Sequence, residues 1–114
     1  MLPQDNKSTK TFQSELSLRQ SHLDIIRGIL HREFPVPGCK AYLFGSRAEG
    51  SEQSASDVDL AIHSREDTTY RIARAKSAFE ESSLPYTVDL VDLDKASASL
   101  QREIEEKGRL IWER

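Results

Sequence analysis

Two closely spaced aspartates offer the clearest chemistry in this sequence. Asp57 and Asp59 open an apolar run that ends near His63, and residues two apart in a strand point to the same face. Neighbouring carboxylates repel each other unless a cation lies between them. Carboxylate oxygens suit Mg²⁺, which usually takes one or two of them together with substrate phosphates. By itself such a pair is more often an exposed acidic turn at the entrance of a strand, but together with the glycine–serine turn that precedes it the pair predicts a magnesium site.

A glycine–serine turn precedes this pair of acids. Gly45 and Ser46 follow a short apolar and aromatic run, residues 41–44, which is typical of a buried strand. Glycine permits a sharp turn or the close approach of a ligand, and backbone N–H groups with the Ser46 hydroxyl can bind phosphate oxygens. Arg47 can reach a phosphate or stay solvated. A phosphate-binding turn beside metal-binding acids is what phosphoryl or nucleotidyl transfer requires.

A third carboxylate has two candidates in the apolar run at residues 86–93. Asp89 and Asp92 would lie on opposite faces of a strand there. Asp89 is the better candidate because it lies in mid-strand, where a buried carboxylate needs a functional reason. Asp92 is at the end of the run, where a turn or capping role costs little. We therefore expect Asp89 to join the first two acids, with Asp92 as the alternative.

Residues 45–60, GSRAEGSEQSASDVDL, resemble the signature of the DNA polymerase beta-like nucleotidyltransferase superfamily: Gly-Ser, a spacer, then Asp-x-Asp. The stretch is most similar to the minimal nucleotidyltransferase (MNT) branch, which adds a third carboxylate from a neighbouring strand. The resemblance covers the chain from about the first predicted helix to the C-terminus. It implies an α/β (α+β) nucleotidyltransferase fold, in which helices pack on a small mixed sheet.

The same resemblance implies a function, a cofactor and a partner. ATP would be the substrate and Mg²⁺ the cofactor. Proteins of this branch are typically paired with a HEPN-domain RNase, as antitoxin to toxin, and the antitoxin transfers AMP to a tyrosine hydroxyl of the toxin. The implied catalytic and metal-binding residues are Asp57, Asp59 and Asp89, and the implied nucleotide-binding residues are Gly45, Ser46 and Arg47.

Two other functions remain open at this point. The chain could be a non-catalytic antitoxin that inhibits by docking alone. It could also be a small-molecule nucleotidyltransferase whose substrate site is completed by another subunit. The 114 residues leave no room for an added substrate domain, so we expect another molecule to bring the acceptor.

Composition narrows the class of protein further. The chain has 16 basic and 19 acidic residues and a net charge of −3, which gives it no general attraction to nucleic acid or to anionic membranes. No apolar stretch reaches the ~18 residues that span a bilayer, and no signal-peptide pattern is visible. The single cysteine, Cys39, excludes an internal disulfide and suits a reducing cytoplasm. We expect a cytoplasmic protein with a flexible tail, residues 1–13, and one domain, residues 14–114.

The predicted order of elements is helix, strand, strand, helix, strand, helix and short strand. Apolar periodicity and turn residues predict helices over about residues 14–33, 69–82 and 95–107, and strands over about 39–44, 58–63, 86–93 and 109–112. Ser17 and Gln20 have the spacing of a capping box for the first helix. Asp94 is placed to cap the last helix, and Gly108 is placed to end it.

Overall fold

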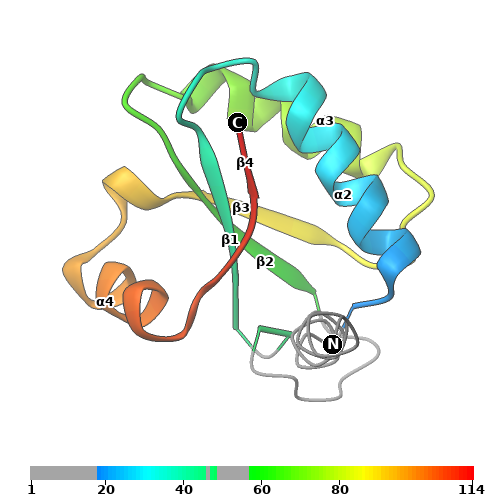
Figure 1. Ribbon diagram of the computed structural model, residues 1–114. Coiled ribbons are helices and arrows are strands. Elements are labelled where there is room, and N and C mark those ends of the chain that lie inside the picture. The colour runs from blue at the N-terminus through cyan, green and yellow to red at the C-terminus, as the bar shows by residue number, and fades with distance from the viewer. Residues whose placement is uncertain (1–17, 46, 49–56) are drawn as a thin grey trace, which may run out of the picture.

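The computed structural model describes residues 18–45, 47–48 and 57–114 (Figure 1). Four strands form one sheet in the order β3-β2-β1-β4. The strands are β1 (Lys40–Phe44), β2 (Val58–His63), β3 (Val88–Asp92) and β4 (Arg109–Glu113). β1 runs antiparallel to both β2 and β4, whereas β2 and β3 are parallel. This mixed sheet with its helices confirms the predicted α/β fold.

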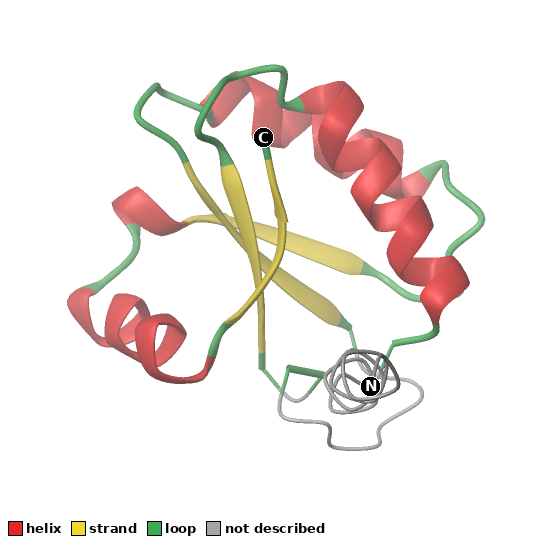
Figure 2. Ribbon diagram, viewed as in Figure 1, coloured by secondary structure: helices red, strands yellow, loops and turns green. Residues whose placement is uncertain are grey.

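The helices divide between the two faces of the sheet (Figure 2). α2 (Gln20–Glu33) and α3 (Thr69–Glu80) lie together on one face, and α4 (Ala98–Lys107) lies on the other, after the short 3₁₀ helix η1 (Leu93–Lys95). The main core lies under α2 and α3, and it includes Val58, Leu60 and Ile62 of β2. Since side chains alternate along a strand, the residues between these three point to the α4 face.

α2 begins later than the sequence predicts. Its first residue is Gln20, and Arg19 occupies the N-cap position without a capping side-chain hydrogen bond. Ser17 of the predicted capping box and the predicted tail, residues 1–13, lie outside the described residues. The predicted apolar stripe is confirmed, because Leu23, Ile26 and Leu30 are all buried in the core. Cys39 is also fully buried.

The prediction that Asp94 caps the last helix is wrong. α4 begins at Ala98, and its cap is Ser97, whose Oγ accepts a hydrogen bond of 3.1 Å from the backbone N–H of Leu100. Asp94 lies in η1, where its carboxylate accepts a hydrogen bond from the backbone N–H of Ser64 and binds Nδ1 of His63 at 2.8 Å. The intervening 3₁₀ turn moves the start of the helix beyond the reach of Asp94.

Gly108 follows α4 as predicted, but it is not a left-handed glycine cap. Its φ of −68° and ψ of 151° are extended. A Cβ at this position would lie 2.6 Å from the carbonyl oxygen of Ile104, so the close approach of backbone to backbone requires glycine here. In the described ranges no helix has both the length and the apolar character to cross a bilayer.

Candidate active site

Asp59 and Asp89 lie directly opposite each other on adjacent parallel strands. The register of β2 and β3 pairs Asp59 with Asp89, and it also pairs Leu60 with Leu90. The two leucines are buried in the core under α2 and α3, so the two aspartates point to the opposite face of the sheet. Asp57, which immediately precedes β2, is exposed. Strand pairing thus brings the predicted third acid beside the Asp-x-Asp motif, although Asp89 is exposed and not the buried carboxylate that its mid-strand position suggested.

Asp92, the alternative third acid, lies at the other end of β3. It pairs with the buried Ile62, so it belongs to the helix-covered face. Its carboxylate accepts a hydrogen bond of 3.0 Å from the backbone N–H of Asp94 and one of 3.5 Å from Oγ1 of Thr68. These bonds give Asp92 a local structural role, away from Asp59.

Negative charge accumulates around Asp59. Burial raises the pKa of this carboxyl, and the charges of Asp89, Asp57 and Glu103 raise the pKa further, in that order. Glu103 comes from α4 and is not among the acids that the sequence motif indicates. Its position in the charge cluster depends on α4 packing against this face of the sheet, which helical periodicity does not predict.

Gly45 lies against the carboxylate of Asp59. β1 ends at Phe44, which pairs with Asp59, so the turn after β1 starts beside the acid. Gly45 has a φ of +81°, and a Cβ built on it would lie 2.7 Å from Oδ2 of Asp59. The backbone conformation disfavours any side chain here, and a side chain would also have to push the Asp59 carboxylate aside. Ser46, the predicted hydroxyl ligand of phosphate, lies outside the described residues.

Arg47 is neither solvated nor aimed away from the protein. Only 6% of its surface is exposed, and its guanidinium carbon lies 4.6 Å from the centroid of the Tyr86 ring. Tyr86 lies just before β3 in the chain. The next residue, Ala48, is buried, and its backbone N–H donates to the carbonyl oxygen of Gly45 at 3.1 Å. No local pattern in the sequence predicts this contact between the turn and Tyr86, because the two residues are far apart in the chain.

The donor set at this site fits a hard divalent cation. In the ranges that the structure describes, no three His, Cys, Asp or Glu side chains already converge closely enough to enclose a metal ion. The side chains that surround Asp59 nevertheless offer carboxylate oxygens, which Mg²⁺ prefers. Their mutual repulsion, which raises the pKa of Asp59, is the interaction that a bound cation would relieve.

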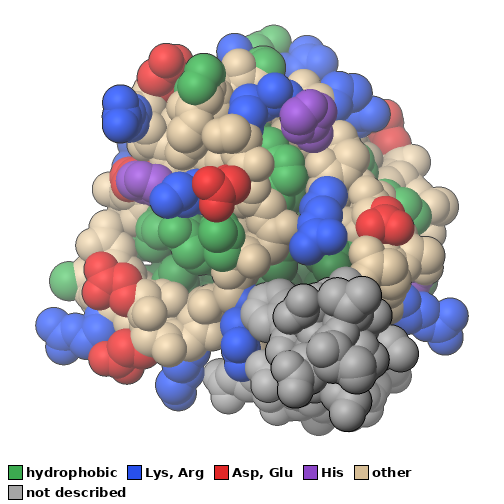
Figure 3. All heavy atoms as spheres, in the orientation of Figure 1, with side chains coloured by type: hydrophobic (Ala, Val, Ile, Leu, Met, Phe, Trp, Pro, Cys, Tyr) green, Lys and Arg blue, Asp and Glu red, His purple; other side chains and the backbone are tan. Residues whose placement is uncertain are grey.

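A cavity of about 500 Å³ lies on the same face as Asp59, between the sheet and α4. Figure 3 shows hydrophobic side chains gathered in a hollow on this face, with charged and histidine side chains around it. None of the three predicted acids is among its described lining residues, but Tyr42 in its wall pairs with Ala61, two residues beyond Asp59 on β2. Its lining residues are Tyr42, His63, Leu93, Asp94, Gln101, Ile104, Glu105 and Gly108.

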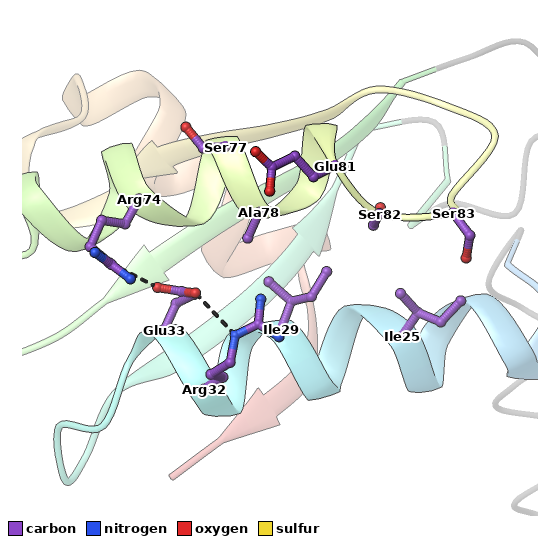
Figure 4. Close-up of a pocket in the computed structure, with 10 residues that line it drawn as sticks. All are labelled: Ile25, Ile29, Arg32, Glu33, Arg74, Ser77, Ala78, Glu81, Ser82 and Ser83. Atoms are coloured by element: carbon purple, nitrogen blue, oxygen red, sulfur yellow. Dashed lines mark hydrogen bonds and ion pairs between the residues drawn. The ribbon is translucent and has the colours of Figure 1, made fainter.

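A second cavity, of about 640 Å³, lies between α2 and α3 (Figure 4). Its buried carboxylate, Glu33, binds Arg32 at 3.1 Å and Arg74 at 3.3 Å. This cavity is on the face of the sheet opposite the aspartate pair. We therefore assign the chemistry to the α4 face, although the cavity there is smaller.

Comparison with known proteins agrees with this geometry. The model of the family described as polymerase beta, nucleotidyltransferase matches residues 26–114. The chain is 35% identical over 102 residues to a probable protein adenylyltransferase, MntA, of Haemophilus influenzae. The matched region covers 89% of this chain and 88% of that protein. The chain is 40% identical over 72 residues to the protein adenylyltransferase MntA of Shewanella oneidensis. That match covers 62% of this chain and about half, 51%, of the Shewanella protein.

Solved structures show the same fold. One is a crystal structure of a toxin–antitoxin with AMP-PNP, which has a TM-score of 0.65, 26% sequence identity, and coverage of 84% of this chain and 75% of that chain. Another is the complex of a tri-AMPylated Shewanella oneidensis HEPN toxin with its MNT antitoxin, which has a TM-score of 0.64, 26% identity, and coverage of 85% and 74%. The family match spans most of the chain, and the curated relatives carry the same enzymatic name. This chain therefore belongs to the polymerase beta nucleotidyltransferase family and is a nucleotidyltransferase.

Proposed function

We propose that this nucleotidyltransferase is the antitoxin of a toxin–antitoxin pair. It transfers AMP from ATP, with Mg²⁺, to a tyrosine hydroxyl of a cognate HEPN RNase toxin and so silences the toxin. The observation that carries the proposal is the pairing of Asp59 with Asp89 beside Gly45. This arrangement joins three acids to the turn that would hold phosphate. The names of the relatives and of the solved complexes support the acceptor and the partner.

The residues of the site divide into two groups by role. Asp57, Asp59 and Asp89 would hold Mg²⁺, which when bound would neutralise phosphate charge and polarise the reacting oxygens. The backbone of Gly45 and the hydroxyl of Ser46 would bind the phosphates of ATP. Arg47 follows them in the same turn. Because its guanidinium group lies over Tyr86, we propose that it serves nucleotide binding by holding this turn.

The proposed reaction is an in-line displacement at the α-phosphorus of ATP. The tyrosine oxygen of the acceptor forms a bond to the α-phosphorus, and the bond from this phosphorus to the oxygen that bridges it to the β-phosphorus breaks. Pyrophosphate leaves with the electron pair of that bond. The phenolic proton passes to a carboxylate, for which Asp89 is the candidate, or to water.

Mass spectrometry of the cognate HEPN protein tests this function. The partner is incubated with ATP, Mg²⁺ and either the wild-type chain or the double variant Asp57→Asn/Asp59→Asn. We expect the wild type to add whole AMP units to a tyrosine of the partner, and the double variant to add none. Asp67→Asn is a matched control, because Asp67 is an exposed acid whose carboxylate binds Thr69 and Lys95 outside the site.

Two results would replace the proposal with another function. If the partner RNase is inhibited with no gain in mass, the chain acts by docking alone. If AMP is transferred to small hydroxyl compounds and never to the partner, the chain is a small-molecule nucleotidyltransferase.

A further inference from the structure

Arg47 and Tyr86 form a buried contact between two segments that each carry part of the site. Arg47 lies in the turn after β1, two residues beyond Gly45, and Tyr86 lies three residues before Asp89. The guanidinium carbon is 4.6 Å from the ring centroid, within the range of a favourable cation–π contact. Because Arg47 is only 6% exposed, little water competes for its charge.

The ring of Tyr86 is itself held from a third side. The imidazole of His22, in α2, meets it edge-on, with centroids 5.4 Å apart and an interplanar angle of 82°. The Tyr86 hydroxyl is buried and has no hydrogen-bond partner among the residues that the structure describes. The ring therefore contributes its face and its bulk at this position, and the described contacts give its hydroxyl no role.

The turn after β1 is thus fixed at two points. At one point the carboxylate of Asp59 fills the space beside Gly45, and at the other the guanidinium group of Arg47 lies over the ring of Tyr86. Ala48, which follows, is buried in the core cluster. The described residues of this turn therefore lie beside β2 at Gly45 and are held to the segment that enters β3 at Arg47.

From this geometry we infer that Arg47 and Tyr86 are positioning residues for AMP transfer. Their stack sets the distance between the phosphate-binding turn and the carboxylates of Asp59 and Asp89. The inference rests on the proposed function, and it assigns Arg47 a role that needs no contact with phosphate. A displacement of about 1 Å within a reacting site can reduce the rate by about a hundredfold, so the loss of such a contact is measurable.

A double-mutant cycle tests the inference. Arg47→Met removes the charge while keeping an unbranched side chain, and Tyr86→Leu removes the ring. We expect each single variant to lower kcat/KM for AMP transfer about tenfold, and the double variant to be no slower than either single one, because both remove the same contact. The conservative variant Tyr86→Phe keeps the ring and should restore the rate to within about twofold of the wild type.

The chain supplies a matched control. Arg74 lies over the ring of Tyr70 at 6.0 Å, but Tyr70 is 70% exposed and lies at the start of α3, outside the site. Tyr70→Leu therefore repeats the same substitution at an exposed cation–π pair. We expect it to leave AMP transfer unchanged.

Hydrogen exchange at the Ala48 amide provides a second measurement that does not depend on activity. This amide donates to the carbonyl oxygen of Gly45 within the turn. We expect it to exchange about tenfold faster in Arg47→Met and in Tyr86→Leu than in the wild type, with no change for Leu43 in β1. If Tyr86→Leu does not fold, Arg47→Met alone decides this measurement.

The outcomes separate the inference from the function. If Arg47→Met impairs transfer while Tyr86→Leu does not, Arg47 acts independently of Tyr86 and the inference is overturned. The inference is also overturned if the losses in kcat/KM of the two single variants multiply in the double variant, or if the exchange rate of the Ala48 amide does not change. If the amide is loosened as expected but the wild type transfers no AMP, the contact holds the turn and the proposed function has failed.

Discussion

A Cβ on Gly45 would lie 2.7 Å from Oδ2 of Asp59, and Gly45 has a φ of +81°. The space beside the glycine of the candidate phosphate-binding turn is thus filled by the carboxylate of the second acid of the Asp-x-Asp motif. Glycine is required here for two separate reasons, namely its backbone conformation and the space that the carboxylate occupies. A side chain at position 45 would displace the group on which the proposed chemistry depends.

Gly45→Ala should therefore abolish AMP transfer and destabilise the protein. Gly38 provides the matched control, because it has a φ of +83° and nothing within 4 Å of the Cβ position. Gly38→Ala should cost about 1–2 kcal/mol of unfolding free energy from backbone strain alone and should leave transfer intact. Urea unfolding and the mass-spectrometric assay measure the two effects. Equal activity of the two variants would contradict the assigned contact.

Asp59→Asn should separate stability from activity. The substitution removes a charge that burial and neighbouring carboxylates disfavour, so the metal-free protein should become more stable at pH 7, by up to about 1 kcal/mol. Transfer should fall by at least about a hundredfold, since a proposed ligand of the cation is lost. Thermal unfolding in the presence of a chelator checks the first effect. A clear loss of stability would show that the negative charge at Asp59 is already compensated.

Asp89→Asn and Asp92→Asn test which acid completes the site. Asp89 lies opposite Asp59, and its loss should slow transfer about 10²- to 10³-fold. Asp92 binds the backbone N–H of Asp94, and asparagine keeps an oxygen for that bond, so its variant should stay within about twofold of the wild type. Single-turnover kinetics with saturating ATP measure both. Reversed effects would identify Asp92 as the third acid.

Glu33→Gln should affect stability without affecting chemistry, because Glu33 lies on the far face between α2 and α3. Burial by itself raises the pKa of this carboxyl, but hydrogen bonds and charges of Arg32 and Arg74 outweigh it and hold the pKa below its ordinary value of 4.5. A lowered pKa means that the ion pairs stabilise the fold at pH values above about 4.5, and that this contribution is lost as the pH falls below that value. Since both arginines are largely exposed, we expect a loss of about 1 kcal/mol at pH 7.

Urea unfolding measured at pH values from about 3 to about 7 checks this pH dependence. The difference between wild type and Glu33→Gln should shrink as the pH falls below the ordinary value of 4.5. Glu80→Gln, at the exposed end of α3, is the control and should change stability by less than about 0.5 kcal/mol. A constant difference across this pH range would mean that packing, and not charge, holds Glu33.

Local patterns in the sequence were sufficient to predict where several residues of the candidate site lie in the fold. Three features depend only on neighbouring residues: the alternation around Asp57 and Asp59, the apolar run before Gly45, and the mid-strand position of Asp89. Strand geometry alone then predicts which face each side chain occupies and where the chain turns. The same reasoning predicted β2 with its observed bounds, Val58–His63. It misplaced the cap of α4, because Asp94 lies in the short turn η1 and binds His63 at the end of β2 and Ser64 just after it.

Only the tertiary structure decided which distant groups meet. The pairing of Asp59 with Asp89 depends on the parallel register of β2 and β3, and the charge of Glu103 reaches Asp59 because α4 packs on that face. The stacking of Arg47 on Tyr86 likewise joins segments that are far apart in the chain. The sequence by itself determined the residue types, their spacing and the faces they occupy. Register and helix placement come from long-range packing of the core, which the local periodicity of the sequence does not predict.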